Sequence, residues 1–170
     1  MGAHDLNVGW DEYHRLVERL ALQVHDSGWH FDAIVCLARG GLRVGDILSR
    51  IFDRPLGVMF TSSYREDAGR QQGAIRIGEH LCSAAELPGT HWLLVDDLVD
   101  SGQTLGEILR VLLARHSQLR EVRSAVIWQK AVSVTRPDYV VEYLADSPWI
   151  RQPFEVYDSL RPEALRDRVR

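Results

Sequence analysis

Short apolar segments rich in β-branched residues alternate along this chain with stretches whose apolar side chains recur every three to four positions. The apolar segments predict buried strands, and the amphipathic stretches predict helices. We expect strands at 32–38, 55–64, 74–77, 91–95, 122–129 and 139–144, and helices at 10–27, around 47–52 and at 105–112. Because strands separated by helices pair in parallel, this order predicts an α/β fold with a parallel sheet covered on both faces.

Length and composition are those of a single globular domain spanning 1–170. Of the 170 residues, 45% are hydrophobic and 26% are charged, which is typical of a soluble protein. No apolar run approaches the roughly 20 residues of a transmembrane helix. The start, MGAHDLNVGW, lacks the basic and apolar regions of a signal peptide, so we expect a cytoplasmic protein. Cys36 and Cys82 form no CxxC pair and are expected to be buried free thiols.

The distribution of charge disfavours nucleic acid as a partner. The formal net charge is −4 and the sequence contains no basic stripe. The Arg-rich tail RPEALRDRVR is interleaved with acids and predicts a solvated helix. Lys130 is the only lysine among 20 basic residues, which is either chance or a position that a guanidinium would not fit.

The segment LLVDDLVDSGQTL at 93–105 places Asp96 and Asp97 directly after an apolar run. Adjacent carboxylates at the end of a buried strand repel each other and resist desolvation, so they need partners. The following turn leads into a helix, whose outward N–H groups and the Ser101 and Thr104 hydroxyls predict a phosphate-binding turn; an ordinary helix N-cap is the alternative. Two acids beside such a turn fit a ribose diol and its 5′-phosphate.

A second unusual loop, Arg39-Gly40-Gly41, follows the predicted strand at 32–38. Carboxyl ends of parallel strands meet at one edge of a sheet, where ligands bind in open α/β folds. The two loops therefore predict one site. Neither GxxxxGK[ST] nor GxGxxG occurs in the sequence, so the site is not of the P-loop or dinucleotide-binding type.

The segment LLVDDLVDSGQT resembles the signature with which type I phosphoribosyltransferases bind 5-phosphoribosyl diphosphate (PRPP). The similarity extends over nearly the whole chain, and it is greatest to the bacterial xanthine–guanine (6-oxopurine) branch of the family, through VGWDEY, ARGGLRVGDILSR, SSYREDAGRQ and DYVVEYLADSPWIRQPFE. It implies the type I phosphoribosyltransferase fold, with a Rossmann-like parallel sheet, a flexible lid hairpin at about 62–78 and a small C-terminal, base-binding hood at about 130–160.

The resemblance also implies which residues bind PRPP. Asp96 and Asp97 meet the ribose hydroxyls, Asp97 lies by Mg²⁺, and residues 100–104 hold the 5′-phosphate. Arg39 and Gly40 belong to the loop that meets the pyrophosphate, and Arg70 belongs to the lid. The implied PRPP-binding set is Arg39, Gly40, Arg70, Asp96, Asp97, Asp100, Ser101, Gly102, Gln103 and Thr104.

Purine recognition is implied at three further places. Lys130 corresponds to the family's lysine that donates a hydrogen bond to the 6-oxo group of the base. The same lysine disfavours adenine, because the 6-amino group of adenine is itself a donor and cannot accept that bond. Trp149 and Ile150 match the pair that packs on the base and offers backbone groups to its 2-substituent. Asp100 is implied as the catalytic residue near purine N7, as proton acceptor or as stabiliser of the attacking base.

The implied function is that of a Mg²⁺-dependent purine salvage enzyme, which transfers the phosphoribosyl group from PRPP to guanine, xanthine or hypoxanthine and releases pyrophosphate. A homo-oligomer, dimer or tetramer, is expected from the family. One alternative is a PRPP-binding regulatory protein, which the acidic balance and the lack of an added DNA-binding segment disfavour. Another is transfer to a different nucleobase, which Lys130 with Trp149 and Ile150 disfavours. Departures from the family pattern in the lid, at 131–138 and at the C-terminal end leave the preferred base open.

Overall fold

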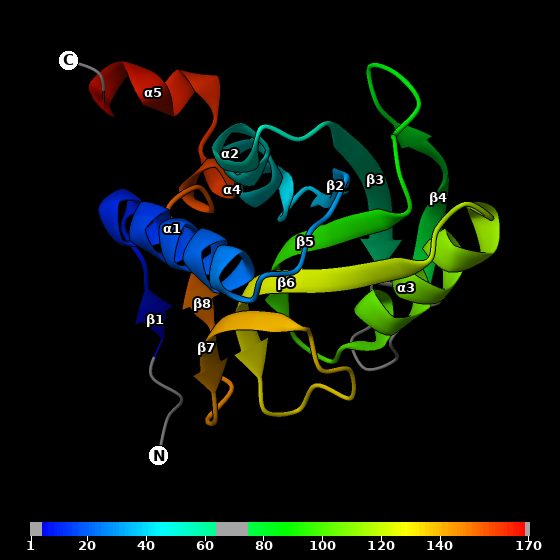
Figure 1. The fold of residues 1–170 in the computed structure, drawn as a ribbon. Helices are drawn as coiled ribbons and strands as arrows, with labels where there is room; N and C mark the ends of the chain where they lie inside the picture. Colours follow the sequence, from blue (N-terminus) through cyan, green and yellow to red (C-terminus); the bar gives the residue numbers. More distant parts are fainter. Residues whose placement is uncertain (1–4, 64–74, 169–170) are drawn as a thin grey trace.

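A mixed sheet forms the centre of the computed structural model, which describes residues 5–63 and 75–168 (Figure 1). Its strands are β2 (Ala33–Ala38), β3 (Leu56–Ser63), β4 (Ile75–Cys82), β5 (His91–Val99), β6 (Glu121–Lys130) and β7 (Tyr139–Leu144). They are ordered β4-β3-β2-β5-β6-β7, and all neighbours run parallel except β3 and β4. The predicted α/β class is confirmed.

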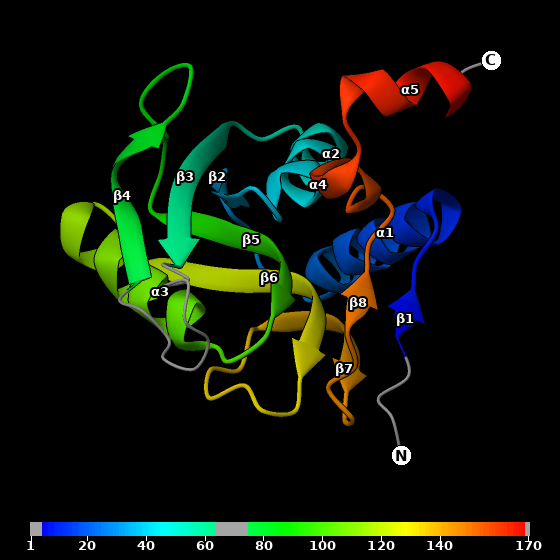
Figure 2. The same cartoon turned by 180° about the vertical axis from the view of Figure 1, so that it is seen from behind.

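Helices cover both faces of this sheet, as Figures 1 and 2 show from opposite sides. Helices α1 (Trp10–Asp26) and α2 (Leu42–Phe52) pack on one face, and α3 (Gln103–Arg115) packs on the other. Each face of the sheet has its own apolar core. Along β5, Leu93 and Val95 face the core beneath α1 and α2, while Trp92 and Leu94 face the core beneath α3. Alternate residues of a strand point to opposite faces, so a strand buried on both sides is apolar at every position.

A two-stranded parallel sheet ties the N-terminal segment to the C-terminal one. It pairs β1 (Leu6–Asn7) with β8 (Ile150–Arg151), and the sequence patterns did not predict it because each strand has only two residues. The chain then forms α4 (Val156–Ser159) and α5 (Pro162–Arg168). The predicted solvated helix of the tail is confirmed, since most of the described side chains of α5 are exposed.

Strands β4 and β5 run several residues beyond their predicted ends, and one cysteine is not buried. β5 continues beyond residue 95 because the backbone stays paired with β6, through Asp96 opposite Val126 and Leu98 opposite Trp128. β4 continues to Cys82 through its antiparallel pairing with β3. Because β4 is the edge strand, Cys82 is exposed, and only Cys36 is buried as predicted.

The paired strands β2 and β5 are the point at which the direction of winding reverses. From β2 the chain crosses through α2 to β3 on one side, and from β5 it crosses through α3 to β6 on the other. The two connections diverge at the carboxyl ends of these strands and leave a crevice between them. In the described part of the chain, no helix is long and apolar enough to span a membrane.

Substitutions of the neighbouring Leu112 and Leu113 of α3 test how much the core beneath this helix contributes to the stability of the fold. Leu112 is fully buried and Leu113 is 45% exposed. We expect Leu112→Ala to lower the free energy of unfolding by about 2–5 kcal/mol, because it leaves a cavity. Leu113→Ala makes the same chemical change in the same helix and should cost at most about 0.5 kcal/mol. Urea unfolding of both variants measures the difference, and equal losses would contradict this packing.

Candidate functional site

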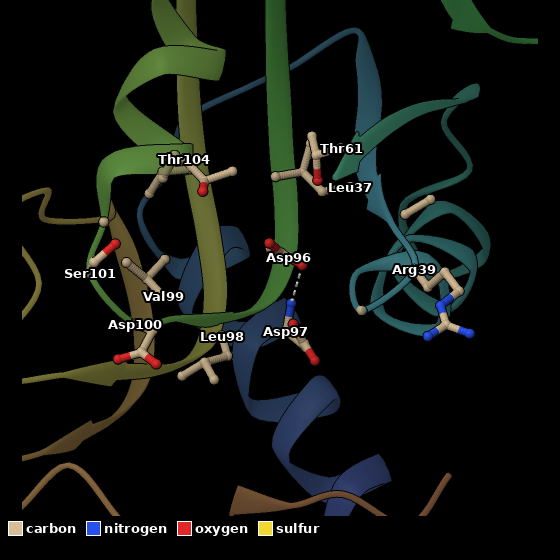
Figure 3. Close-up of a pocket in the computed structure, with 14 residues that line it drawn as sticks. Leu37, Arg39, Thr61, Asp96, Asp97, Leu98, Val99, Asp100, Ser101 and Thr104 are labelled. Carbon is tan, nitrogen blue, oxygen red and sulfur yellow. Dashed lines mark hydrogen bonds between the residues drawn. The ribbon is translucent and has the colours of Figure 1, made fainter. Parts of the chain in front are cut away.

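A cavity of about 310 Å³ opens at the carboxyl ends of β2 and β5 (Figure 3). Its walls come from the end of β2 and the loop after it, from the end of β5, and from the turn that begins α3. The residues that line it are Leu37, Ala38, Arg39, Gly40, Thr61, Asp96, Asp97, Leu98, Val99, Asp100, Ser101, Gly102, Thr104 and Leu105. The two loops predicted to share one site therefore do lie together.

The cavity brings together most of the residues implied for PRPP. Those that line it are Arg39, Gly40, Asp96, Asp97, Asp100, Ser101, Gly102 and Thr104. Gln103 is exposed and is not among the lining residues. Arg70 and most of the predicted lid lie outside the described residues. Thr61 of β3, which the sequence patterns did not single out, also contributes to the wall.

Asp96 and Asp97 follow one another on β5, so their side chains leave the strand on opposite faces. Both line the cavity, where Figure 3 labels them. The backbone N–H of Asp97 donates to Asp96 Oδ1 over 2.9 Å. Burial and the neighbouring charge of Asp97 raise the pKa of the Asp96 carboxyl well above its usual range. The folded protein therefore disfavours the charged form of Asp96 when no ligand is bound.

The glycines of the loop after β2 allow it to approach these acids. A Cβ atom on Gly40 would collide with the Asp97 carboxylate, and one on Gly41 would lie 2.7 Å from the Val95 carbonyl oxygen. The peptide bond between Ala38 and Arg39 is cis. The Arg39 guanidinium lies 3.8 Å from the Asp158 carboxylate of α4, in an exposed ion pair.

The turn at 100–104 has the geometry of an anion-binding turn. Gly102 adopts a left-handed conformation with φ of 78°, and α3 begins directly after it. The first N–H groups of a helix have no intrahelical acceptor, and the helix dipole favours negative charge there. Thr104 and Leu105 of this first turn line the cavity. The turn can therefore hold a phosphate group.

The loop after β6 packs against this turn and supports its conformation. Val134 N–H donates to the Ser101 carbonyl over 2.9 Å. A Cβ atom on Gly102 would collide with Ser133 Oγ and would lie 2.6 Å from the Thr135 nitrogen. The conformation of the turn thus depends on the segment that follows Lys130.

Lys130, at the end of β6, contacts Asp100, which lines the cavity. Its Nζ donates to Asp100 Oδ2 over 3.1 Å, and the residue is only 7% exposed. Burying an ammonium group is costly unless a hydrogen-bonding partner such as a carboxylate compensates it. The predicted purine-recognition lysine and the predicted catalytic acid are therefore in direct contact, next to the turn at 100–104.

Trp149 and Ile150 differ in what they can offer a base. Trp149 is 54% exposed, so its ring is accessible. The Ile150 side chain is buried in the core beneath α1 and α2, which leaves its backbone as the part that can meet a ligand. The Trp149 carbonyl already accepts a hydrogen bond from Leu6 N–H, over 2.8 Å.

Two buried residues near Asp97 had not been predicted. The Gln152 side-chain amide donates through Nε2 to Asp97 Oδ2. The Tyr13 hydroxyl has no hydrogen-bond partner among the described residues, and burial together with the charge of Asp97 raises its pKa. Both residues lie in segments quoted for the family resemblance, but their distance from Asp97 along the chain gave no signal of contact.

Comparison with known proteins gives consistent matches. Residues 9–159 match the family model described as the phosphoribosyl transferase domain. The xanthine-guanine phosphoribosyltransferase of Ruegeria sp. (strain TM1040) is 30% identical over 157 residues, covering 88% of this chain and 85% of the relative. That of Chromohalobacter salexigens is 28% identical over 164 residues, covering 96% and 91%. The Helicobacter pylori xanthine-guanine-hypoxanthine phosphoribosyltransferase structure has a TM-score of 0.77 at 27% identity, covering 96% of this chain and 99% of that one.

The raised pKa of Asp96 predicts how stability depends on pH. Between the pKa values of Asp96 in the unfolded and folded states, the folded protein binds more protons, so stability falls as pH rises through that range. Asn at this position can still accept the Asp97 N–H bond but carries no charge. We expect Asp96→Asn to unfold at a higher urea concentration than wild type at pH 7, by a margin that shrinks as pH is lowered towards about 4.

The control for Asp96→Asn is Asp146→Asn, which makes the same change on an exposed turn and should leave the urea midpoint nearly unchanged. A stability gain of Asp96→Asn that does not depend on pH would contradict the raised pKa of Asp96.

Two glycines with positive φ provide a matched test of the phosphate-binding turn. Gly102→Ala combines left-handed strain with collisions against Ser133 and Thr135, whereas a Cβ added to Gly28, which has φ of 70°, would meet no atom within 4 Å. We expect Gly102→Ala to weaken ribose 5-phosphate binding roughly 5- to 150-fold, as measured by calorimetry. Gly28→Ala should lower stability by about 1–2 kcal/mol and leave binding unchanged. If wild type and both variants bind ribose 5-phosphate with equal affinity, the turn at 100–104 has no role in binding the phosphate.

Proposed function

Since this chain belongs to the phosphoribosyltransferase family, we propose that it transfers the 5-phosphoribosyl group of PRPP to a 6-oxopurine base. The products are the purine nucleoside 5′-monophosphate and pyrophosphate. The relatives named xanthine-guanine phosphoribosyltransferase, matched over most of their own length, support this purine salvage activity.

The observation that carries the proposal is the position of the Lys130 ammonium. It lies at the end of β6, 3.1 Å from Asp100, and Asp100 opens the turn that would hold the 5′-phosphate. A base placed between the sugar and this pair would meet a donor in Lys130 and an acceptor in Asp100. A 6-oxopurine presents an acceptor at O6, and its neighbouring N7 can carry a proton, so the pair matches that edge.

The remaining residues have roles in binding PRPP. The turn at 100–104 holds the 5′-phosphate, Asp96 and Asp97 accept hydrogen bonds from the ribose hydroxyls, and the Arg39-Gly40 loop faces the pyrophosphate. In the reaction, the bond from the anomeric carbon to pyrophosphate breaks and a bond to the purine nitrogen forms. The base loses one proton, which Asp100 is positioned to accept or to compensate. Holding both reactants in line replaces a bimolecular encounter with a unimolecular step.

The residues of the cavity fit a magnesium ion that is bound mainly through the substrate. Within 5–63 and 75–168, no group of three His, Cys, Asp or Glu side chains is placed to hold a metal. Mg²⁺ usually takes one or two carboxylates and completes its shell with water and substrate phosphates. Asp97, which lines the cavity beside Gly40, is the carboxylate that we assign to it. When bound, Mg²⁺ would offset the negative charge on the pyrophosphate.

The test is pyrophosphate release with PRPP and Mg²⁺ and with guanine, xanthine, hypoxanthine or adenine. We expect turnover with one or more 6-oxopurines and none with adenine. Lys130→Met keeps the apolar stem and removes the donor, so kcat/KM for the 6-oxopurine should fall roughly 10- to 150-fold, the equivalent of one hydrogen bond to a charged group.

Arg136→Ala is the matched control, because it removes a cation from an exposed position in the loop that follows Lys130. It should leave kcat/KM within about twofold of wild type. PRPP binding without turnover of any base would overturn the proposal and favour a regulatory role. Turnover of adenine, or an unaffected Lys130→Met variant, would refute the assignment of Lys130.

A further inference from the structure

Gln152 is one of the few buried polar residues of the described chain, and its place in the fold is unusual. It is 7% exposed and follows β8 in the C-terminal segment, yet its Nε2 donates to Oδ2 of Asp97 on β5. The two residues are 55 positions apart in the sequence. The contact therefore joins the segment that carries Trp149 and Ile150 to the strand that carries the PRPP acids.

The Asp97 carboxylate is in close contact with two other segments. Gln152 donates to one of its oxygens, and the Gly40 backbone lies so close to it that a Cβ on Gly40 would collide. The backbone N–H of Asp97 donates to Asp96 Oδ1, which helps to fix this part of the strand. A charged hydrogen-bond acceptor with a fixed orientation loses little entropy when it binds a ligand. The geometry is that of a preorganised carboxylate.

An amide differs from a cation as a partner for this acid. Arg or Lys would neutralise the carboxylate and compete with a bound metal ion or hydroxyl, whereas a neutral amide fixes the orientation and leaves the charge. Arg43, whose charge acts on Tyr13, instead stacks on the Phe154 ring, 4.0 Å from its centroid. The buried Tyr13 hydroxyl is another polar group close to Asp97, and it is neutral.

We propose that Gln152 is a positioning residue for PRPP binding, which acts by holding the Asp97 carboxylate towards the cavity. The inference rests on the proposed function, because it assigns to Asp97 a role on the PRPP side of the site. Gln152 does not touch the reacting atoms and acts only through Asp97. The C-terminal segment thus contributes to the PRPP half of the site as well as to the base half.

The first experiment compares Gln152→Met with Gln129→Met, the same change at the other buried glutamine of the described chain. We expect Gln152→Met to raise both KM and the calorimetric Kd for Mg²⁺–PRPP about tenfold, the loss of one hydrogen bond to a charged group, with KM for the purine within twofold of wild type. Gln129→Met should leave the Kd for PRPP unchanged. Urea unfolding of both variants checks that they are folded. Equal changes in KM for PRPP and for the purine would overturn the proposal, because they indicate a general disturbance of the hood.

The second experiment asks whether Gln152 acts through Asp97. In an Asp97→Asn background, adding Gln152→Met should change the Kd for Mg²⁺–PRPP by less than twofold, because the carboxylate is already absent. A full tenfold loss in that background would refute the proposal. Gln152→Glu is the second variant, since it keeps the side-chain length and places an acceptor against Asp97; it should bind PRPP more weakly than Gln152→Met.

The wild-type protein separates this inference from the proposed function. If wild type binds PRPP and turns over a 6-oxopurine while Gln152→Met behaves like wild type, only the role of Gln152 is wrong. If wild type does not bind PRPP, the proposed function itself fails, and the role of Gln152 fails with it.

Discussion

The parallel pairing of β2 with β5 is the constraint on which the site depends. Because the crossovers leave these strands in opposite directions, α2 and α3 lie on opposite faces and the carboxyl ends of the two strands stay uncovered. This pairing brings the Arg39-Gly40 loop and the Asp96–Thr104 segment together, although they are nearly sixty residues apart in the chain. Gly40 then packs directly against the Asp97 carboxylate.

The site carries an electrostatic cost that the rest of the fold offsets. Two acids follow the buried run Trp92–Val95 of β5, and burial disfavours the charged form of Asp96. Large apolar cores on both faces of the sheet, with Trp92 and Trp128 fully buried, provide the stability that this arrangement requires. Binding sites are commonly destabilising in this way, because groups arranged for a ligand are poorly satisfied without it.

Contacts from the end of the chain make the two halves of the site interdependent. The segment after Lys130 supports the phosphate-binding turn through Val134, Ser133 and Thr135, and the segment after Ile150 reaches Asp97 through Gln152. The residues that we propose for base binding thus lie in segments that also support the turn at 100–104 and Asp97. A base and a phosphoribosyl group bound in these two halves would face each other across Asp100 and Lys130.

The sequence by itself determined the six strands of the main sheet, helices α1, α2, α3 and α5, the α/β class and the residues of the two loops. These follow from apolar periodicity, turn chemistry and a family motif, all of which are local along the chain. Only the tertiary structure decided that β1 pairs with β8, that β5 runs on to Val99, that Cys82 is exposed, and that Gln152 and Tyr13 lie beside Asp97. The physical reason is that such features depend on pairing and packing between distant segments, which leave no periodic trace in either segment alone.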